Sequence, residues 1–348
     1  RGTYIFPINP SLRLSSDIFE YCQSTLPKWN SISVSGYHIR EAGSTAVQEL
    51  AFTFANAITY INTAKKHGVD IEKLTTQMSF FFNSHRDFFE EVSKFRAARE
   101  IWAKIVKEKF KIENSISQLC RFHVQTGGST LTAQQIENNT VRTTLQALAA
   151  VLGGAQSIHT NGKDEAISLP SEENALAALR IQQIIAYETN IPNFVDPIGD
   201  SDLINTRTKE IVKEVLEKID DISNKGGMEK LIETGEIEKE IADSSIQFQN
   251  NLESKEEILI GVNQFIDNNE ENIINIESQK NNNKKRVDLV TQFKKGRDHK
   301  KVSNALSELE EKAKSDENLI PYIVTCAKNE CTLGEISDTL RKVFGEYS

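Results

Sequence analysis

The chain has few cysteines, and this limits the kinds of protein it can be. Its 348 residues include only four, which are too few and too scattered to form a disulfide framework in a chain of this length: Cys22, Cys120, Cys326 and Cys331. The last two lie close in sequence, but no second cysteine pair or histidine cluster accompanies them to complete a zinc site. We therefore expect packed or surface thiols, no bound metal and a reducing compartment, the cytoplasm.

Positive charge and long apolar runs are also scarce. The net charge is -9 at pH 7 and the pI is near 5.4, which argues against a nucleic-acid binder, because neutralising phosphates requires a basic surface. No stretch of about 18 apolar residues is present and no signal peptide opens the chain, so neither membrane insertion nor secretion is expected. The first residue is Arg1 rather than methionine, and we interpret this N-terminus as a cut edge.

What the sequence contains in quantity is an alternation of short apolar runs with longer amphipathic segments. The period of apolar residues predicts strands at 3–7, 32–37, 78–82, 118–126 and 155–160, and helices at 45–66, 86–110, 133–152 and 172–188. His67-Gly68 is expected to end the first of these helices. A strand followed by a helix every 35 to 45 residues, roughly, implies parallel strands joined by crossover helices.

Two architectures accommodate this alternation, an open doubly wound sheet and a closed eight-stranded barrel. Polar residues near the ends of several predicted strands favour the barrel, whose enzymes assemble their sites from many successive loops. These residues are Tyr37, His38, Ser79, His123, Gln125, His159 and Thr160. Because only about five strand–helix units are visible, we expect an α/β fold in which residues 1–205 form the C-terminal portion of a TIM-type (β/α)8 barrel.

Residues 206–348 differ in character and are expected to form a mainly helical extension with a scaffolding or docking role. Charged helices are predicted at 206–243, and further helices at 300–314 and 335–344. Residues 257–265 read as a strand, and the Asn-rich stretch 268–286 is expected to be a solvated loop.

Several segments resemble the signature segments of the methylmalonyl-CoA mutase family, in matching order. They are Arg1-Gly-Thr-Tyr-Ile-Phe-Pro7, Ser35-Gly-Tyr-His-Ile-Arg-Glu-Ala-Gly43, Ser79-Phe-Phe-Phe82, Phe88-Phe-Glu-Glu-Val92, Phe95-Arg-Ala-Ala-Arg99, Ser129-Thr-Leu-Thr-Ala-Gln134 and Gln156-Ser-Ile-His-Thr-Asn161. The resemblance is strong up to residue 197 and continues more weakly through 258–263 and 332–337 to the end. It therefore covers nearly the whole chain.

The resemblance implies an isomerase, the large catalytic subunit of a mutase that depends on adenosylcobalamin. Such enzymes interconvert (R)-methylmalonyl-CoA and succinyl-CoA by a radical carbon-skeleton rearrangement, in which the thioester carbonyl moves to a neighbouring carbon. Three alternatives stay open: an isobutyryl-CoA or 2-hydroxyisobutyryl-CoA mutase subunit, a non-catalytic assembly subunit or fragment, and an unrelated barrel lyase or aldolase. The last is disfavoured, because no Schiff-base lysine or metal-ligand cluster follows the predicted strands.

Carried over by resemblance, His38 takes the position of the family's hydrogen-bond donor to the thioester carbonyl, and Tyr37 that of an active-site tyrosine. A donor aimed at an oxygen that gains electron density stabilises the transition state. Arg1 matches an arginine that contacts the free carboxylate of a dicarboxylic acyl group and the cofactor. Relatives that act on isobutyryl-CoA or 2-hydroxyisobutyryl-CoA have glutamine at that position. Further positions match substrate contacts, Ser79 and Gln125, and corrin contacts, Gly128, Glu165 and Ser168.

The chain also departs from the family pattern. Gln77 stands where the family usually has an arginine that contacts the CoA ester, so a neutral amide replaces a charged bidentate donor and should bind this substrate more weakly. Residues 196–202 likewise differ from the family's continuation.

One family motif is missing from this sequence. The cobalamin-binding module carries an Asp-x-His-x-x-Gly motif, and His299, in Arg297-Asp-His-Lys-Lys301, lacks the glycine. The resemblance therefore implies a separate small cobalamin-binding subunit, docked through residues 206–348, and a G-protein chaperone of the mutase as a further partner. By itself this piece is expected to be inactive, because a barrel with missing strands has open edges.

Overall fold

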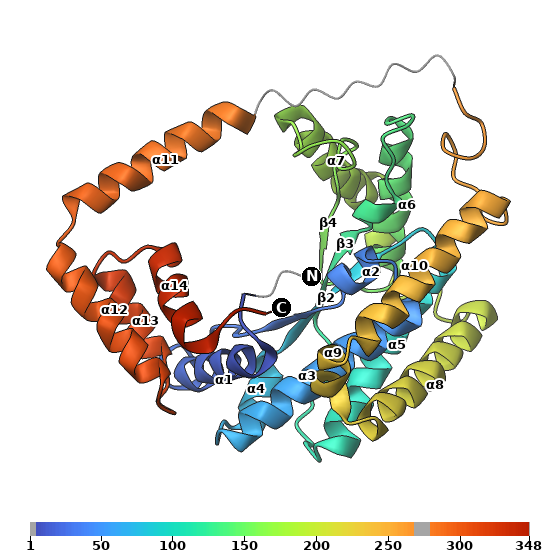
Figure 1. Ribbon diagram of the computed structural model, residues 1–348. Coiled ribbons are helices and arrows are strands. Elements are labelled where there is room, and N and C mark those ends of the chain that lie inside the picture. The colour runs from blue at the N-terminus through green and yellow to red at the C-terminus, as the bar shows by residue number, and fades with distance from the viewer. Residues whose placement is uncertain (1–4, 268–278, 348) are drawn as a thin grey trace. The chain divides into compact units, whose positions relative to one another are not determined.

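The computed structural model describes residues 5–267 and 279–347, and the chain divides into two compact units. Unit 1 combines residues 1–31, 62–71 and 273–348, and unit 2 combines residues 32–61 and 72–272. Figure 1 labels the elements of both units in chain order. Helices dominate both units, and every strand of the described chain belongs to unit 2.

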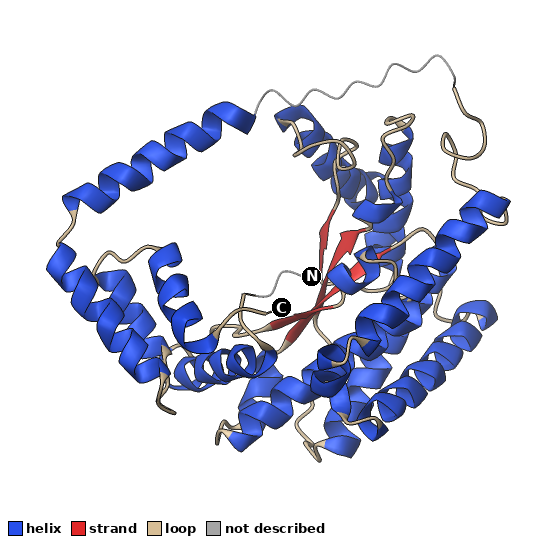
Figure 2. Ribbon diagram, viewed as in Figure 1, coloured by secondary structure: helices blue, strands red, loops and turns tan. Residues whose placement is uncertain are grey.

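A four-stranded parallel sheet forms the centre of unit 2, and Figure 2 shows its strands in red with helices around them. The strands, in spatial as well as chain order, are β1 (Ser33–Ser35), β2 (Ser79–Ser84), β3 (Phe122–Thr126) and β4 (Ser157–His159). Register pairs Ser35 with Phe81, Phe81 with His123, and Gln125 with His159. This sheet confirms the predicted α/β class and is consistent with part of a TIM-type barrel.

The helices of unit 2 connect and flank these strands. They are α2 (Tyr37–Glu41), α3 (Ala46–Lys66), α4 (Ile71–Gln77), α5 (Phe88–Lys104), α6 (Asn138–Leu152), α7 (Glu172–Glu188), α8 (Asp202–Asn224), α9 (Gly227–Glu233) and α10 (Glu236–Ser254). The four predicted helices of this region are confirmed as α3, α5, α6 and α7. The end of α3 agrees with the expectation for His67-Gly68, because Gly68 has a φ of 77° that glycine adopts without strain.

The two faces of the sheet differ in polarity, because successive side chains along a strand point to opposite faces. One face is apolar, and its aromatic rings pack against Phe54 of α3 and Trp102 and Phe95 of α5. Five strand residues on that face are at most 3% exposed: Val34, Phe80, Phe82, Phe122 and Val124. This face is the core of unit 2.

The opposite face is mostly polar. It carries Ser33 and Ser35 of β1, Ser79, Phe81 and Asn83 of β2, His123 and Gln125 of β3, and Ser157 and His159 of β4. A continuous polar face along four neighbouring strands is not suited to a hydrophobic core. It provides many hydrogen-bonding groups for a ligand. Every predicted strand residue of the candidate site lies on this face.

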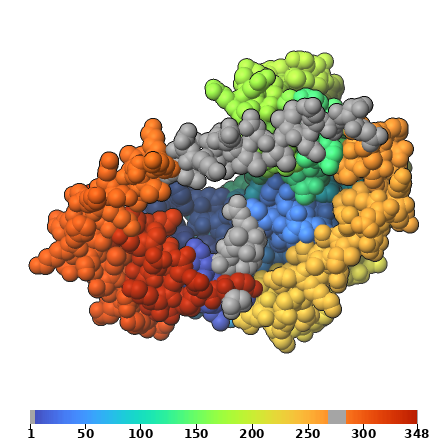
Figure 3. Space-filling view, turned by 45° about the horizontal axis from the view of Figure 1, so that its top comes forward, coloured from blue at the N-terminus to red at the C-terminus, as the bar shows by residue number. Residues whose placement is uncertain are grey.

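Helices α8 to α10 pack against the helices that cover the sheet, within the same unit. Phe52 and Ala55 of α3 form a core cluster with Ile222, Met228 and Leu231. In the space-filling view, this segment forms a yellow-to-orange surface next to the blue of the early chain (Figure 3). The charged helices predicted for 206–243 are therefore confirmed, whereas the docking role of residues 206–348 stays a prediction.

The regular elements in the described residues of unit 1 are all helices. It contains α1 (Ile8–Thr25), α11 (Gln279–Gly296), α12 (His299–Ala313), α13 (Ile320–Lys328) and α14 (Leu333–Phe344). Its core includes Leu309, Leu319 and Leu340 together with Cys326 and Cys331. All four cysteines of the chain are free and buried, which confirms packed thiols.

Three local predictions were wrong. Residues 5–7 do not form a strand, because Pro7 caps the N-terminus of α1; residues 1–4 lie outside the described chain. Residues 257–265 form turns with one isolated bridge, held by the Asn263 amide, which donates to the backbone oxygens of Leu252 and Glu257. The predicted loop 268–286 is wrong for residues 279–286, which belong to α11, whereas residues 268–278 lie outside the described chain.

Within the described ranges, no helix combines the length and the apolarity needed to cross a membrane.

Candidate active site

The site begins where β1 leaves the sheet. The amide of Gly36 donates to the backbone oxygen of Phe81 over 2.8 Å, and α2 starts at the next residue. A Cβ on Gly36 would stand 2.4 Å from Thr53 Oγ1 and 2.9 Å from Glu49 Cγ. Only glycine therefore fits at this turn, which aims the first residues of α2 over the polar face of the sheet.

Tyr37 is held by stacking and by hydrogen bonds. Its ring lies parallel to that of Phe81 at 4.9 Å, and the residue is 6% exposed. Its hydroxyl forms hydrogen bonds with the side chain of Asn161 and the backbone of Gly128. Burial, with the charge of Glu41, raises the pKa of Tyr37 well above its usual value, so the phenol stays neutral across the physiological range.

His38 is half-buried on α2, next to the same aromatic rings. Its ring stands at right angles to Tyr37, with the centroids 5.3 Å apart, and edge-on to Phe81 at 6.0 Å. Its Nδ1 lies 3.0 Å from the hydroxyl of Ser35. Because this contact and the flanking rings set the tilt of the imidazole, His38 is oriented before any ligand arrives.

Gln125 lies on β3 and is oriented by Asn161. Its Nε2 donates to Asn161 Oδ1 over 2.9 Å, and Asn161 Nδ2 in turn donates to the backbone oxygen of Thr126 over 2.8 Å. Asn161 is only 1% exposed, and its backbone N–H donates to Thr126 Oγ1. One buried asparagine after β4 therefore orients both Gln125 and the hydroxyl of Tyr37.

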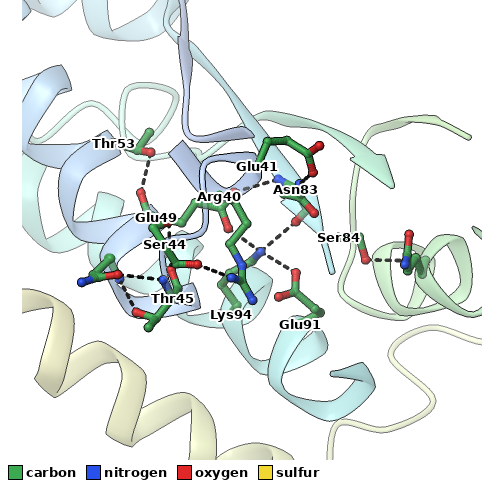
Figure 4. A network of polar contacts seen from close by, with 12 residues as sticks. Arg40, Glu41, Ser44, Thr45, Glu49, Thr53, Asn83, Ser84, Glu91 and Lys94 are labelled. Carbon is green, nitrogen blue, oxygen red and sulfur yellow. Dashed lines mark hydrogen bonds and ion pairs between the residues drawn. The ribbon is translucent and has the colours of Figure 1, made fainter. Parts of the chain in front are cut away.

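Gly128 lets the backbone approach the side chains of this cluster closely. A Cβ at this residue would lie 3.0 Å from Glu41 Oε2 and 3.4 Å from both Asn161 Nδ2 and the hydroxyl of Tyr37. Glu41 itself accepts hydrogen bonds from Asn83 Nδ2 over 2.6 Å and from the amide of Ser129 over 2.8 Å; Figure 4 shows the first of these. Burial raises the pKa of Glu41, although these hydrogen bonds oppose the shift.

Two predicted residues, Glu165 and Ser168, lie on the exposed turn that follows β4. The charge of Glu165 contributes to the raised pKa values of Tyr37 and Glu41, so its carboxylate is electrostatically close to both. Ser168 is exposed, and its amide donates to the backbone oxygen of Asp164 over 3.0 Å. Glu165 thus belongs to the cluster, whereas no described contact ties Ser168 to it.

Gln77 and Ser79 lie at the other end of the sheet. Gln77 is the last residue of α4, and Ser79 is the first residue of β2 rather than the end of a strand, as the sequence had suggested. Ser79 precedes Asn83 by four residues, or about 13 Å of strand at 3.3 Å per residue. Ser79 nevertheless belongs to the polar side, because it shares the face of Phe81 and Asn83.

A cavity of about 830 Å³ opens beside the cluster, at the carboxyl ends of β2 and β3. Glu41 and Ser129 form part of its wall, with His85 and Arg86 from the loop after β2. Burial and the nearby guanidinium of Arg40 hold the pKa of His85 well below its usual value, so this wall carries a neutral imidazole. The cavity wall therefore combines this neutral imidazole with charged groups of both signs, among them Arg86 and Glu41.

The structure brings together Tyr37, His38, Gln125, Gly128 and Glu165 at the carboxyl end of the sheet. Arg1 lies outside the described residues. No group of three or more His, Cys, Asp or Glu side chains in the described ranges is placed to hold a metal ion.

Sequence reasoning missed three residues of the cluster: Glu41, Asn83 and Asn161. Each lies inside a segment quoted for the resemblance, or directly after one. What the sequence could not indicate is that their side chains, which belong to different strand–helix units, hydrogen-bond to one another or to Tyr37.

Known proteins are similar to this chain over nearly its whole length. The family model described as methylmalonyl-CoA mutase matches residues 1–346. The large subunit of 2-hydroxyisobutanoyl-CoA mutase from Aquincola tertiaricarbonis is 43% identical over 99% of this chain and 62% of its own length. The mitochondrial methylmalonyl-CoA mutases of Mus musculus and Homo sapiens are 38% and 39% identical over 100% of this chain, which spans 47% and 46% of their lengths.

The chain therefore spans about half to three fifths of the length of these relatives, and the match extends through both compact units. With the family model covering its whole described length, this chain belongs to the methylmalonyl-CoA mutase family.

Proposed function

We propose that this chain supplies the barrel and substrate site of an adenosylcobalamin-dependent acyl-CoA mutase that interconverts (R)-methylmalonyl-CoA and succinyl-CoA. The observation that carries the proposal is the oriented pair Tyr37–His38 above Phe81, within reach of the Gln125–Asn161 hydrogen bond. A neutral phenol, an oriented imidazole and an amide on one face are suited to a carbonyl, because each can donate a hydrogen bond.

In this proposal His38 donates a hydrogen bond to the thioester carbonyl oxygen. The contact with Ser35 and the flanking rings hold the imidazole in place, so little reorganisation is needed when that oxygen gains electron density. Tyr37 stays neutral and packs beside the acyl group, where it excludes water. Gln125, fixed by Asn161, provides a further polar contact to the substrate.

The proposed substrate contacts lie at both ends of the polar face, and a CoA thioester is long enough to reach both. The acyl group would lie near His38, and the pantetheine arm would run along the strands towards Ser79 and Gln77. About 13 Å of strand separates those ends, a length that an extended pantetheine arm covers. Gln77 would contact this arm through a neutral amide instead of the family's guanidinium.

The residues around Gly128 fit a corrin. A flat macrocycle needs backbone that it can approach closely, and Gly128 has no side chain to prevent this. A Cβ there would also come within 3.4 Å of Glu41, Asn161 and Tyr37. The carboxylates of Glu41 and Glu165 can accept hydrogen bonds from the amides at the corrin rim or from ribose hydroxyls. Ser168 and Arg1 are further proposed contacts, and Arg1 would also pair with the free carboxylate of the acyl group. When bound, adenosylcobalamin supplies the radical chemistry.

A separate small subunit would supply the cobalamin-binding module. The name of the Aquincola tertiaricarbonis relative, a large subunit, supports such a partner. Residues 206–348 are the proposed docking region, and a G-protein chaperone is a further proposed partner. A reducing cytoplasm suits four free thiols.

A second candidate function is 2-hydroxyisobutyryl-CoA or isobutyryl-CoA mutase. It is favoured by the 43% identity to the 2-hydroxyisobutanoyl-CoA mutase large subunit, against 38% and 39% for the two methylmalonyl-CoA mutases. Arg1 argues for the dicarboxylic substrate, since those other relatives have glutamine there. A non-catalytic subunit remains the third reading, and it predicts no turnover of either substrate by the full-length protein.

The test is the steady-state rate of the full-length protein with a cobalamin-binding subunit and adenosylcobalamin, on both classes of substrate. Replacement His38→Ala should lower kcat by about 10²–10³-fold, as expected for the loss of one donor to a developing oxyanion. The matched control is His67→Ala in the exposed turn after α3, outside the proposed docking region, which should leave the rate unchanged. Full activity in the His38 variant would contradict the proposed role.

A further inference from the structure

Three charged side chains are completely buried beneath the candidate site. Glu49 of α3 and Glu91 and Lys94 of α5 are each 0% exposed. Lys94 Nζ donates to Glu49 Oε2 over 2.6 Å, to Glu91 Oε2 over 2.5 Å and to the backbone oxygen of Asn83 over 2.7 Å. Figure 4 shows the ammonium at the centre of these contacts. We call these three residues the buried triad.

Stability alone is a weak explanation for the buried triad. Removing charges from water costs several kcal/mol for each ion, and apolar replacements of similar volume are often at least as stable. The triad also has one carboxylate more than it has cations, and Glu91 Oε1 has no hydrogen-bond partner. A feature that costs this much is better explained by what it holds in place.

The triad binds the backbone edge of β2 at Asn83, on the side where no strand of the described chain is adjacent. The backbone groups of Ser79 and Phe81 face β1, which supplies the oxygen of Ile32 and the amide of Gly36 as partners. Asn83 is two residues further along the same edge, where β1 has already left the sheet. Its amide donates instead to Glu49 Oε1 over 2.7 Å, and its oxygen accepts from Lys94. Two triad side chains thus replace the missing strand.

The same side chains contact the turn that aims Tyr37 and His38. Glu49 Cγ would lie 2.9 Å from a Cβ on Gly36, so the glutamate packs directly beneath that turn. The side chain of Asn83, whose backbone the triad binds, donates to Glu41 over 2.6 Å. Glu49 is therefore linked to the site on both sides, through Gly36 and through Asn83.

We propose that Glu49 and Lys94 are positioning residues, which take the place of a strand beside Asn83 so that β1 can leave the sheet and present Tyr37, His38 and Glu41. Glu91 balances the charge of Lys94 and contacts neither Asn83 nor Gly36. The catalytic consequence rests on the proposed mutase function, whereas the structural consequence does not.

The chain offers a matched pair of variants. Glu49→Gln and Glu91→Gln each remove one carboxylate from the triad, but only Glu49 accepts from the Asn83 amide. In Glu49→Gln, an NH2 group replaces one of the two carboxylate oxygens, and because this group only donates, it cannot accept from Lys94 or from the Asn83 amide. Glu49→Asp keeps the charge but shortens the side chain by one methylene group. This variant replaces Glu49→Gln in the test if the glutamine variant does not fold.

The first measurement is hydrogen exchange at the Asn83 amide in the full-length protein. We expect exchange to become about tenfold faster in Glu49→Gln and Glu49→Asp, as for the loss of one buried hydrogen bond, and to change by less than about twofold in Glu91→Gln. The second is steady-state kinetics of the holoenzyme: kcat should fall about tenfold in the Glu49 variants while KM changes by less than about twofold, because substrate still binds to a misaligned site.

Equal exchange at Asn83 in the Glu49 and Glu91 variants would overturn the proposal. Faster exchange with unchanged kcat would overturn the positioning of catalytic groups. If the unmodified holoenzyme shows no turnover, the mutase function fails and the exchange comparison alone decides whether the triad replaces a strand.

Discussion

At the residue scale, the cluster depends on Asn161 more than on any residue with a predicted chemical role. This amide bonds to Gln125, to Thr126 and to the hydroxyl of Tyr37 while it is almost completely buried. Removing it would leave several buried polar groups without partners, each at a cost of about 1–3 kcal/mol unless water enters.

Asn161→Ala should therefore lower the free energy of unfolding by about 2–3 kcal/mol, measured by urea titration of the full-length protein. Asn193→Ala, in an exposed turn after α7, is the control and should change it by less than about 0.5 kcal/mol. Equal effects of the two replacements would show that the hydrogen bonds of Asn161 do not stabilise the folded state.

Gln77→Arg restores the charge that related sequences have at this position. A guanidinium forms stronger, bidentate hydrogen bonds with anionic or carbonyl groups of a CoA ester than an amide does. We expect KM for the acyl-CoA substrate to fall about tenfold, the equivalent of one charge-assisted hydrogen bond, with little change in kcat. Gln247→Arg, on an exposed position of α10, controls for added charge and should leave KM unaltered.

The sequence predicted site residues that lie inside family-like segments better than the buried residues that hold those site residues in place. Tyr37 and His38 could be predicted from the Ser35–Gly43 segment, and the structure brings them together with Gln125 and Gly128. Asn83, Glu49 and Lys94 could not be singled out, because an isolated glutamate or lysine in a helix predicts a solvated surface. Their burial results from contacts between distant segments, which periodicity does not encode.

At the element scale, α14 is stabilised by a charge network at its N-terminus. Glu335 forms a capping box with Thr332 and also accepts from the guanidinium of Arg297, which is 5% exposed. The hydrogen bond with Arg297, and those with Thr332, hold the pKa of Glu335 well below its usual value.

A depressed carboxylate pKa stabilises the folded state above the unfolded pKa, about 4.5, and this contribution is lost as the pH falls below it. Glu335→Gln should therefore lower the thermal unfolding temperature at pH 7, and the difference from the unmodified protein should shrink at pH 3. Glu308→Gln, at an exposed position of α12, is the control. A difference that stays constant across this range would contradict the assigned ion pair.

Elements with a long, regular apolar period were predicted well, and those defined by contacts were not. The period in 45–66 and 172–188 predicts α3 and α7, the second with the boundaries observed. The strand predicted at 257–265 failed because Asn263 satisfies the backbone locally, which favours turns over sheet pairing. α4 was missed, since seven residues give too few turns for a periodic signal.

At the scale of the whole molecule, the α/β class and the parallel sheet followed from the order of strands and helices. The grouping of segments into two compact units did not, because residues 1–31 and 273–348 belong to one unit despite their distance in sequence. Local patterns predict elements, whereas contacts between chain ends depend on burial that only the folded chain defines.

The central claim is that the polar face around His38 carries out a carbon-skeleton rearrangement of an acyl-CoA. The most direct measurement uses methylmalonyl-CoA labelled with carbon-13 at both the thioester carbonyl and the methyl carbon, incubated with the full-length protein, a cobalamin-binding subunit and adenosylcobalamin. Migration of the thioester group joins the two labelled carbons, so the account predicts succinyl-CoA with a one-bond carbon–carbon coupling in its NMR spectrum. Recovery of unchanged substrate, or a product without that coupling, would contradict it.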